Sequence, residues 1–167
     1  MAQPEVWLRG PLPNIPPLLQ PVAHSLLQCR EELTASVTGL TPEQIWARPC
    51  GAASVGFHGR HAAGSLDRLF TYARGEPLSP IQQAVLAAEG DPDVTPGIDL
   101  RIVAAFDEAV ERALEQLRTT SEATLLEERG VGRAQLPSTV LGLLFHAAEH
   151  TQRHMGQLVT TAKVLSA

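Results

Sequence analysis

The chain has 167 residues, of which 44% are hydrophobic and 19% charged, a composition typical of a globular protein and unlike that of a disordered one. Its net charge of -5 and the lack of a Lys/Arg cluster argue against nucleic-acid binding. No apolar run approaches the roughly 20 residues of a membrane span, so we expect no membrane association. The two cysteines, Cys29 and Cys50, form no disulfide framework, which favours a cytoplasmic location.

The length is that of one domain, by the usual range of roughly 100–200 residues, so we expect a single domain over residues 1–167. Residues 1–16 contain four prolines, which predict an extended N-terminal arm because proline restricts itself and the residue before it. The apolar spacing that follows predicts a long helix over about 17–38, ended by Gly39.

Turn and cap residues divide the middle of the chain. Thr41 followed by Pro42 predicts the start of a short helix, with Thr41 as its N-cap. A second long helix is expected over about 53–74, and Gly75 ends it. Ser79-Pro80 predicts another short helix, which Gly90 ends.

The last third of the chain predicts two more long helices. Residues 98–118 have the clearest helical pattern, with apolar residues repeating at 3, 4 and 7. Residues 119–135 are less regular and show no strong strand pattern, and Pro137 is expected to begin a final helix that runs to about residue 164. Four long helices with short helices in the connections predict an all-α four-helix bundle, whose helix order around the bundle stays open.

Five of the six histidines fall on two of these long helices. On the last helix His146, His150 and His154 follow one another at spacings of four, which places neighbours on a shared face. The first and third lie about 12 Å apart along the axis, too far for one metal ion. One adjacent pair is therefore the candidate for metal binding.

A helical wheel at about 100° per residue selects His150 and His154 as the inward pair. On this wheel His154 lies roughly 60° from the centre of the apolar face, His150 roughly 100° and His146 roughly 140°. His146 is therefore expected near solvent or at a rim. The apolar face consists of Val140, Leu144, Ala147, Thr151, Met155 and Leu158.

The helix over about 53–74 carries the second group of histidines. His58 points most directly inward, and His61 lies about 60° from that direction. Either ring could complete a three-imidazole site with His150 and His154, and Arg68, on the same flank as His61, is a polar group expected to border such a site. Three neutral imidazoles bind a divalent first-row ion and leave coordination positions open.

Two segments resemble motifs of the DinB/YfiT-like family. Residues 54–68, Ser-Val-Gly-Phe-His-Gly-Arg-His-Ala-Ala-Gly-Ser-Leu-Asp-Arg, are similar to its second-helix motif. Residues 145–158, Phe-His-Ala-Ala-Glu-His-Thr-Gln-Arg-His-Met-Gly-Gln-Leu, are similar to its last-helix motif, a His-x-x-x-His followed by Gly-Gln. The helix order and loop lengths also fit nearly the whole chain.

This resemblance implies a four-helix bundle that holds a divalent metal, zinc or nickel, on His61, His150 and His154. It selects His61 over His58 because the family's ligand is the histidine followed by small or apolar residues. His58 and His146 are extra relative to the pattern, and either is a candidate to support a ligand from behind. Characterised members of the wider superfamily include isomerases and S-transferases that use low-molecular-weight thiols such as mycothiol or bacillithiol.

We therefore expect a metal-dependent enzyme, a thiol S-transferase/isomerase or a hydrolase, that acts on a small-molecule substrate and uses a low-molecular-weight thiol in the transferase case. No catalytic residue is identified, and Arg68 is a candidate contact for an anionic substrate group. The alternative is a non-catalytic metal-stabilised bundle that serves as a sensor or scaffold. A homodimer is compatible with the Ala- and Gly-rich helix faces, although the sequence shows no dimer surface.

Overall fold

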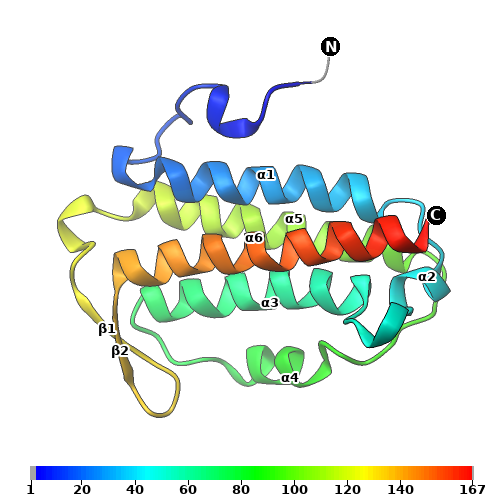
Figure 1. Cartoon of the computed structure of the whole chain (residues 1–167). Coiled ribbons are helices and arrows are strands. Elements are labelled where there is room, and N and C mark those ends of the chain that lie inside the picture. Colours follow the sequence, from blue (N-terminus) through cyan, green and yellow to red (C-terminus); the bar gives the residue numbers. More distant parts are fainter. Residues whose placement is uncertain (1–2, 167) are drawn as a thin grey trace.

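The computed structural model describes residues 3–166, so positions 1, 2 and 167 of the expected domain lie outside the described residues. Within residues 3–166, four long helices form a bundle (Figure 1). The all-α class and the four-helix bundle expected from the sequence are confirmed. The four helices are α1 (Gln20–Val37), α3 (Val55–Ala73), α5 (Ile98–Thr119) and α6 (Val140–Leu165).

The structure fixes the order of the helices, which the sequence left open. Helix α1 packs mainly against α5 and α6, and α3 packs against the same two helices, so α1 and α3 occupy opposite corners. The connections between the diagonal helices carry further short elements. Residues 38–54 carry α2 (Pro42–Trp46) and the 3-10 turn η3 (Pro49–Gly51), and residues 120–139 carry the turn η4 (Glu122–Thr124) and a hairpin.

Side-chain caps begin the short helices where the sequence predicts them. The Thr41 hydroxyl accepts a hydrogen bond from the Gln44 backbone N–H, and the Gln44 side chain accepts one from the Thr41 N–H. Ser79 and Gln82 form the same reciprocal pair at the start of α4 (Pro80–Ala88). Each pair satisfies N–H groups that have no partner within the helix.

The segment before α6 differs from the expectation. Strands β1 (Glu128–Val131) and β2 (Leu136–Thr139) form an antiparallel hairpin, with Val131 opposite Leu136. Helix α6 begins at Val140 with Thr139 as its cap, and Pro137 lies in β2, so the predicted helix start at Pro137 was wrong. A two-stranded hairpin consists only of edge strands, which tolerate a proline without an N–H.

The N-terminal arm lies along α1. Its residues include the 3-10 turn η1 (Val6–Leu8), and a further turn, η2 (Pro17–Leu19), leads into α1. Val6 is buried, and its N–H donates to the Gln28 side-chain oxygen at 3.0 Å. The arm therefore covers part of the surface of α1.

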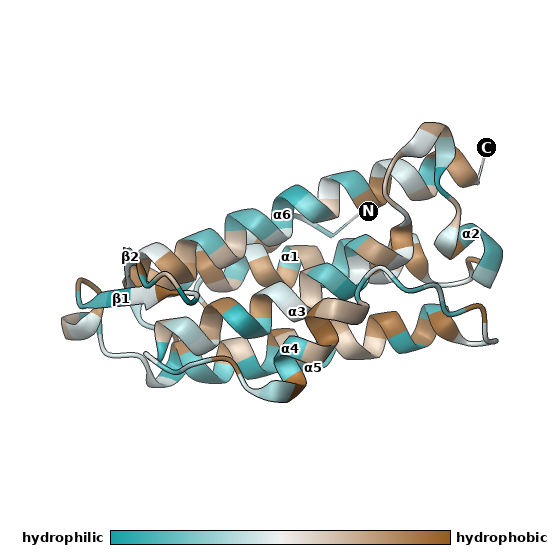
Figure 2. Cartoon of the chain, turned by 90° about the horizontal axis from the view of Figure 1, so that it is seen from below, coloured by the Kyte–Doolittle hydropathy of each residue, from teal (hydrophilic) through white to brown (hydrophobic). Residues whose placement is uncertain are grey.

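The core lies between the four long helices, along the apolar face of each. Figure 2 shows hydrophobic and hydrophilic residues alternating along the helices. All six residues predicted for the inward face of α6 are buried. No helix within residues 3–166 combines the length and apolar character that crossing a membrane requires.

Candidate metal centre

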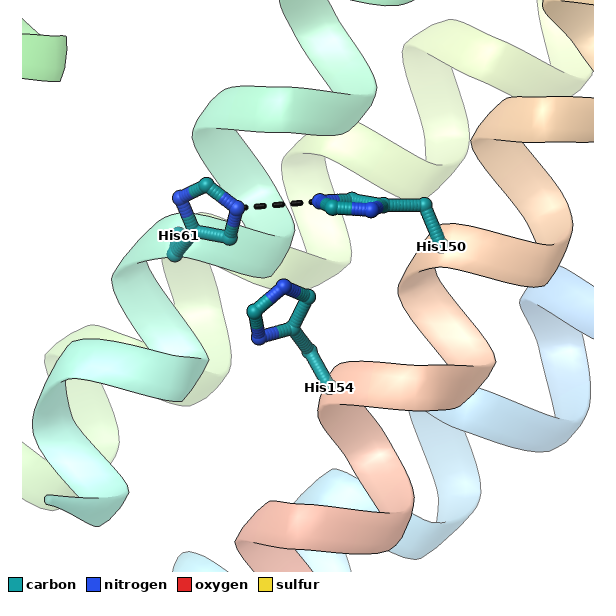
Figure 3. A group of neighbouring side chains, drawn as sticks. All are labelled: His61, His150 and His154. Carbon is teal, nitrogen blue, oxygen red and sulfur yellow. Dashed lines mark hydrogen bonds between the residues drawn. The ribbon is translucent and has the colours of Figure 1, made fainter. Parts of the chain in front are cut away.

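Helices α3 and α6 run side by side and bring three imidazoles together (Figures 1 and 3). His61 comes from α3, and His150 and His154 come from successive turns of α6. One potential ligand atom from each residue lies within 4.8 Å of those of the other two. These three residues are called the histidine cluster. They are the residues that the resemblance to the DinB/YfiT-like family implies as metal ligands.

The rings face one another through their outer nitrogens. The Nε2 atoms of His61 and His150 lie 3.0 Å apart. The Nδ1 atom of His154 lies 3.0 Å from Nδ1 of His58, which leaves Nε2 of His154 as its remaining nitrogen. In Figure 3 one nitrogen of the His154 ring points toward the gap between His61 and His150. The arrangement therefore gathers three nitrogens around one point.

The structure places His58 behind the cluster. It is 4% exposed, in keeping with the inward direction of the wheel, yet its ring contacts His154 and does not join the three-residue group. The wheel could not separate His58 from His61 because it gives the direction of a side chain and not the position of its ring nitrogens. His146 is exposed and pairs with Glu149 at 2.7 Å, as expected for a residue at the rim.

Burial favours the neutral form of His154 and lowers its pKa below the ordinary value. The pKa of His154 falls to about 4, with the neighbouring rings of His61, His150 and His58 adding to the effect. Burial, and then the positive charge that His61 would carry, also lower the pKa values of His58 and His150. Since a neutral imidazole has a free lone pair, these rings are in the protonation state that binds metal.

A glutamate that sequence reasoning missed completes the surroundings of His61. Glu89, at the C-terminal end of α4, accepts a hydrogen bond from His61 Nδ1 at 2.7 Å and one from Arg68 Nη1 at 2.6 Å. The sequence places Glu89 only near the end of a short helix, so no local pattern relates it to His61. Arg68 is 8% exposed, and the role predicted for it as a substrate contact stays a prediction.

Two cavities flank these side chains. One of about 280 Å³ is lined by Phe57, whose ring stacks on His61 with the centroids 5.3 Å apart, and by Arg48, Ser54 and Gly90. The other, of about 560 Å³, lies between α3, α4 and α5 and includes Arg68 and Glu89 in its wall. Each cavity thus touches a direct neighbour of the cluster.

The chemistry of the cluster fits a divalent transition metal. Three imidazoles are the ligand set of many open metal sites, and bundle interiors commonly hold such sites. The Nδ1 atom of His150 is buried without a hydrogen-bond partner in the described part of the chain, so no group behind this ring fixes its tautomer.

The comparison with protein families agrees with the geometry. Residues 25–158, from α1 to the last third of α6, match the DinB superfamily. The chain therefore belongs to the DinB superfamily, as the two histidine motifs predicted. A comparison with curated proteins found no match.

Proposed function

We propose that the protein is a metal-dependent enzyme that holds a zinc or nickel ion on His61, His150 and His154. The observation that carries this proposal is the convergence of the three rings, with one nitrogen from each within 4.8 Å of the others. A site of three protein ligands leaves one or more positions for water or substrate, which is typical of catalytic metal centres. The proposed reactions are those of a thiol S-transferase/isomerase or a hydrolase acting on a small molecule.

The protein's own residues would prepare this site in two ways. The lowered pKa values of His150 and His154 keep their lone pairs free at neutral pH. The Phe57 ring stacks on His61 and also lines the 280 Å³ cavity, which is the place proposed for a small substrate. A divalent ion bound there would lower the pKa of a water or thiol and polarise a substrate oxygen.

We also propose that the protein acts in the cytoplasm, where low-molecular-weight thiols are kept reduced. Cys29 is buried and Cys50 is exposed, and both are free thiols. Free thiols are typical of proteins in a reducing compartment.

Metal analysis of the untagged protein tests the ligand assignment. We expect close to one zinc or nickel ion per chain in the wild type and loss of at least about nine tenths of it in His150→Ala, because two imidazoles alone hold such an ion weakly. His146→Ala is the matched control, since His146 lies one turn away on the same helix and is exposed. Full metal content in His150→Ala would refute the assignment.

The same preparations distinguish an enzyme from a metal-stabilised scaffold. With Co²⁺ in the site, adding a low-molecular-weight thiol should change the visible absorption if a coordination position is open to ligands. An unchanged spectrum, together with a higher melting temperature on metal binding, would instead support the sensor or scaffold function.

A further inference from the structure

Glu89 is the one charged acceptor that contacts the histidine cluster within the described residues. It caps the C-terminal end of α4, and its side chain reaches back to α3. Only 3% of the residue is exposed, although α4 itself has no buried residue. A buried carboxylate at the end of an exposed helix calls for a specific reason, because burying a charge is costly unless it is paired.

Both oxygens of the Glu89 carboxylate are used. Oε2 lies 2.7 Å from His61 Nδ1, and Oε1 lies 2.6 Å from Arg68 Nη1. The carboxylate can only accept, so in a neutral His61 ring the proton is on Nδ1. Nε2 of His61 is then left with its lone pair, and it is this atom that faces His150 at 3.0 Å.

The backbone of α3 makes room for this arrangement at Gly64. A Cβ atom built on Gly64 would overlap Oε1 of Glu89 and lie 2.8 Å from Nη1 of Arg68. The absence of a side chain at Gly64 therefore lets the Glu89–Arg68 pair lie directly against α3, one turn from His61.

The other two rings lack such a partner. Nδ1 of His154 faces the neutral ring of His58, and Nδ1 of His150 has no hydrogen-bond partner among the described residues. The Nδ1 atoms of His61, His154 and His150 thus contact a carboxylate, an imidazole and no polar atom, respectively. This asymmetry makes His61 the ring with the most strongly fixed tautomer and the greatest electron donation.

We propose that Glu89, held by Arg68, is a positioning residue that fixes the Nδ1–H tautomer of His61 and strengthens Nε2 as a metal ligand. The proposal rests on the function proposed above, since it assumes that the cluster binds metal. A carboxylate behind a ligating histidine fixes the ring orientation and raises its basicity, and removing such a partner typically lowers metal affinity by about 10–100-fold. Helix α4 would therefore tune a centre whose ligands come from α3 and α6.

Titration of the full-length protein with Co²⁺ and Zn²⁺ tests this role. We expect Glu89→Gln to weaken the binding of both ions by about 10–100-fold and to shift the visible bands of bound Co²⁺, because the charge behind His61 is lost. Glu111→Gln is the control, since it removes an exposed carboxylate from its ion pair with Arg30, and it should leave affinity and spectrum unchanged. A role of Glu89 in folding alone would not move the Co²⁺ bands of the folded fraction.

The outcomes separate this inference from the proposed function. If the wild type binds neither ion, both fail; if the wild type binds and folded Glu89→Gln binds equally with the same spectrum, only the role of Glu89 is refuted. Because Glu89→Gln leaves Arg68 without its partner and could unfold the protein, ¹⁵N NMR of the metal-free wild type gives a second test. We expect His61 protonated at Nδ1 alone, and a neutral ring protonated at Nε2 would overturn the proposal.

Discussion

Helices α6 and α4 both pack against α3, yet they are attached to it in different ways. The inward face of α6 is fully buried, and residues such as Leu144, Met155 and Leu158 have no exposed surface. In α4 no residue is buried, and Ile81 is 76% exposed. Polar contacts hold α4 instead: the Gln82 amide donates to Asp67 and Thr71 at 2.7 Å each, and Glu89 follows at the end of the helix.

Apolar packing fixes the position of α6, whereas hydrogen bonds fix the position of α4. Burial of large apolar side chains stabilises by about 1.5–3 kcal/mol each, so the positions of His150 and His154 follow from the hydrophobic packing of α6. A hydrogen bond contributes only about 0.5–1.5 kcal/mol, so the position of Glu89 depends on a few specific polar partners. We therefore expect His150 and His154 to keep their positions even when the contacts of Glu89 change.

The strongest test of this contrast truncates one apolar side chain on each helix. Leu158→Ala should lower the free energy of unfolding by about 2–5 kcal/mol, because Leu158 is fully buried and its removal leaves a cavity. Ile81→Ala in α4 should change it by no more than about 0.5 kcal/mol, as is usual for exposed positions. Urea unfolding followed by circular dichroism measures both, and similar losses would show that α4 is also held by apolar contacts.

Much of this arrangement follows from sequence patterns that are local. The apolar spacing of residues 98–118 and the Thr41 and Ser79 caps depend on neighbours in the chain, and the structure confirms the elements they predict. The outward position of His146 follows from the same periodicity. Local patterns thus gave the helices and the faces of α6 correctly.

The features that were missed depend on contacts between distant segments. The hairpin strands have no alternating apolar pattern: Glu128–Val131 has only one apolar side chain, and β2 contains Pro137. Pairing with each other, and the Arg129 side chain donating to the Ala73 carbonyl at 2.9 Å, fix them in place. Glu89 lies 28 positions from His61, and no periodicity indicates that a loop returns it to α3.

Acidic pH should lower the free energy of unfolding, because histidines between α3 and α6 then have to take up protons. The folded pKa of His154, about 4, lies below its ordinary value of 6.5, so as pH falls through this range the unfolded chain takes up the proton first. The stability from the neutral ring is thus full above pH 6.5 and is lost toward pH 4. For the metal-free protein we expect a loss of about 1–2 kcal/mol between pH 7.5 and 5, after allowing for solvent screening of a partly exposed ring.

Unfolding of the metal-free protein at both pH values checks this expectation. His58 and His150, whose pKa values are also lowered, remain in His154→Gln, so this variant should still lose some stability at acidic pH. The wild type should lose more, because it also has His154. An equal loss in the two proteins would show that the ring of His154 is not held neutral by its surroundings.

The smallest expected effect compares the same substitution on the two sides of this contrast. Gly156 lies in α6 with open space where a Cβ would be, so Gly156→Ala should stabilise the protein by about 0.5–1 kcal/mol through helix propensity alone. At Gly64 in α3 the same methyl group would meet the buried Glu89–Arg68 pair, and this clash should cancel or reverse the gain. Thermal unfolding of the two variants measures the difference. Equal stabilisation would mean that the end of α4 moves aside at little cost, and that its polar contacts are weaker than their geometry suggests.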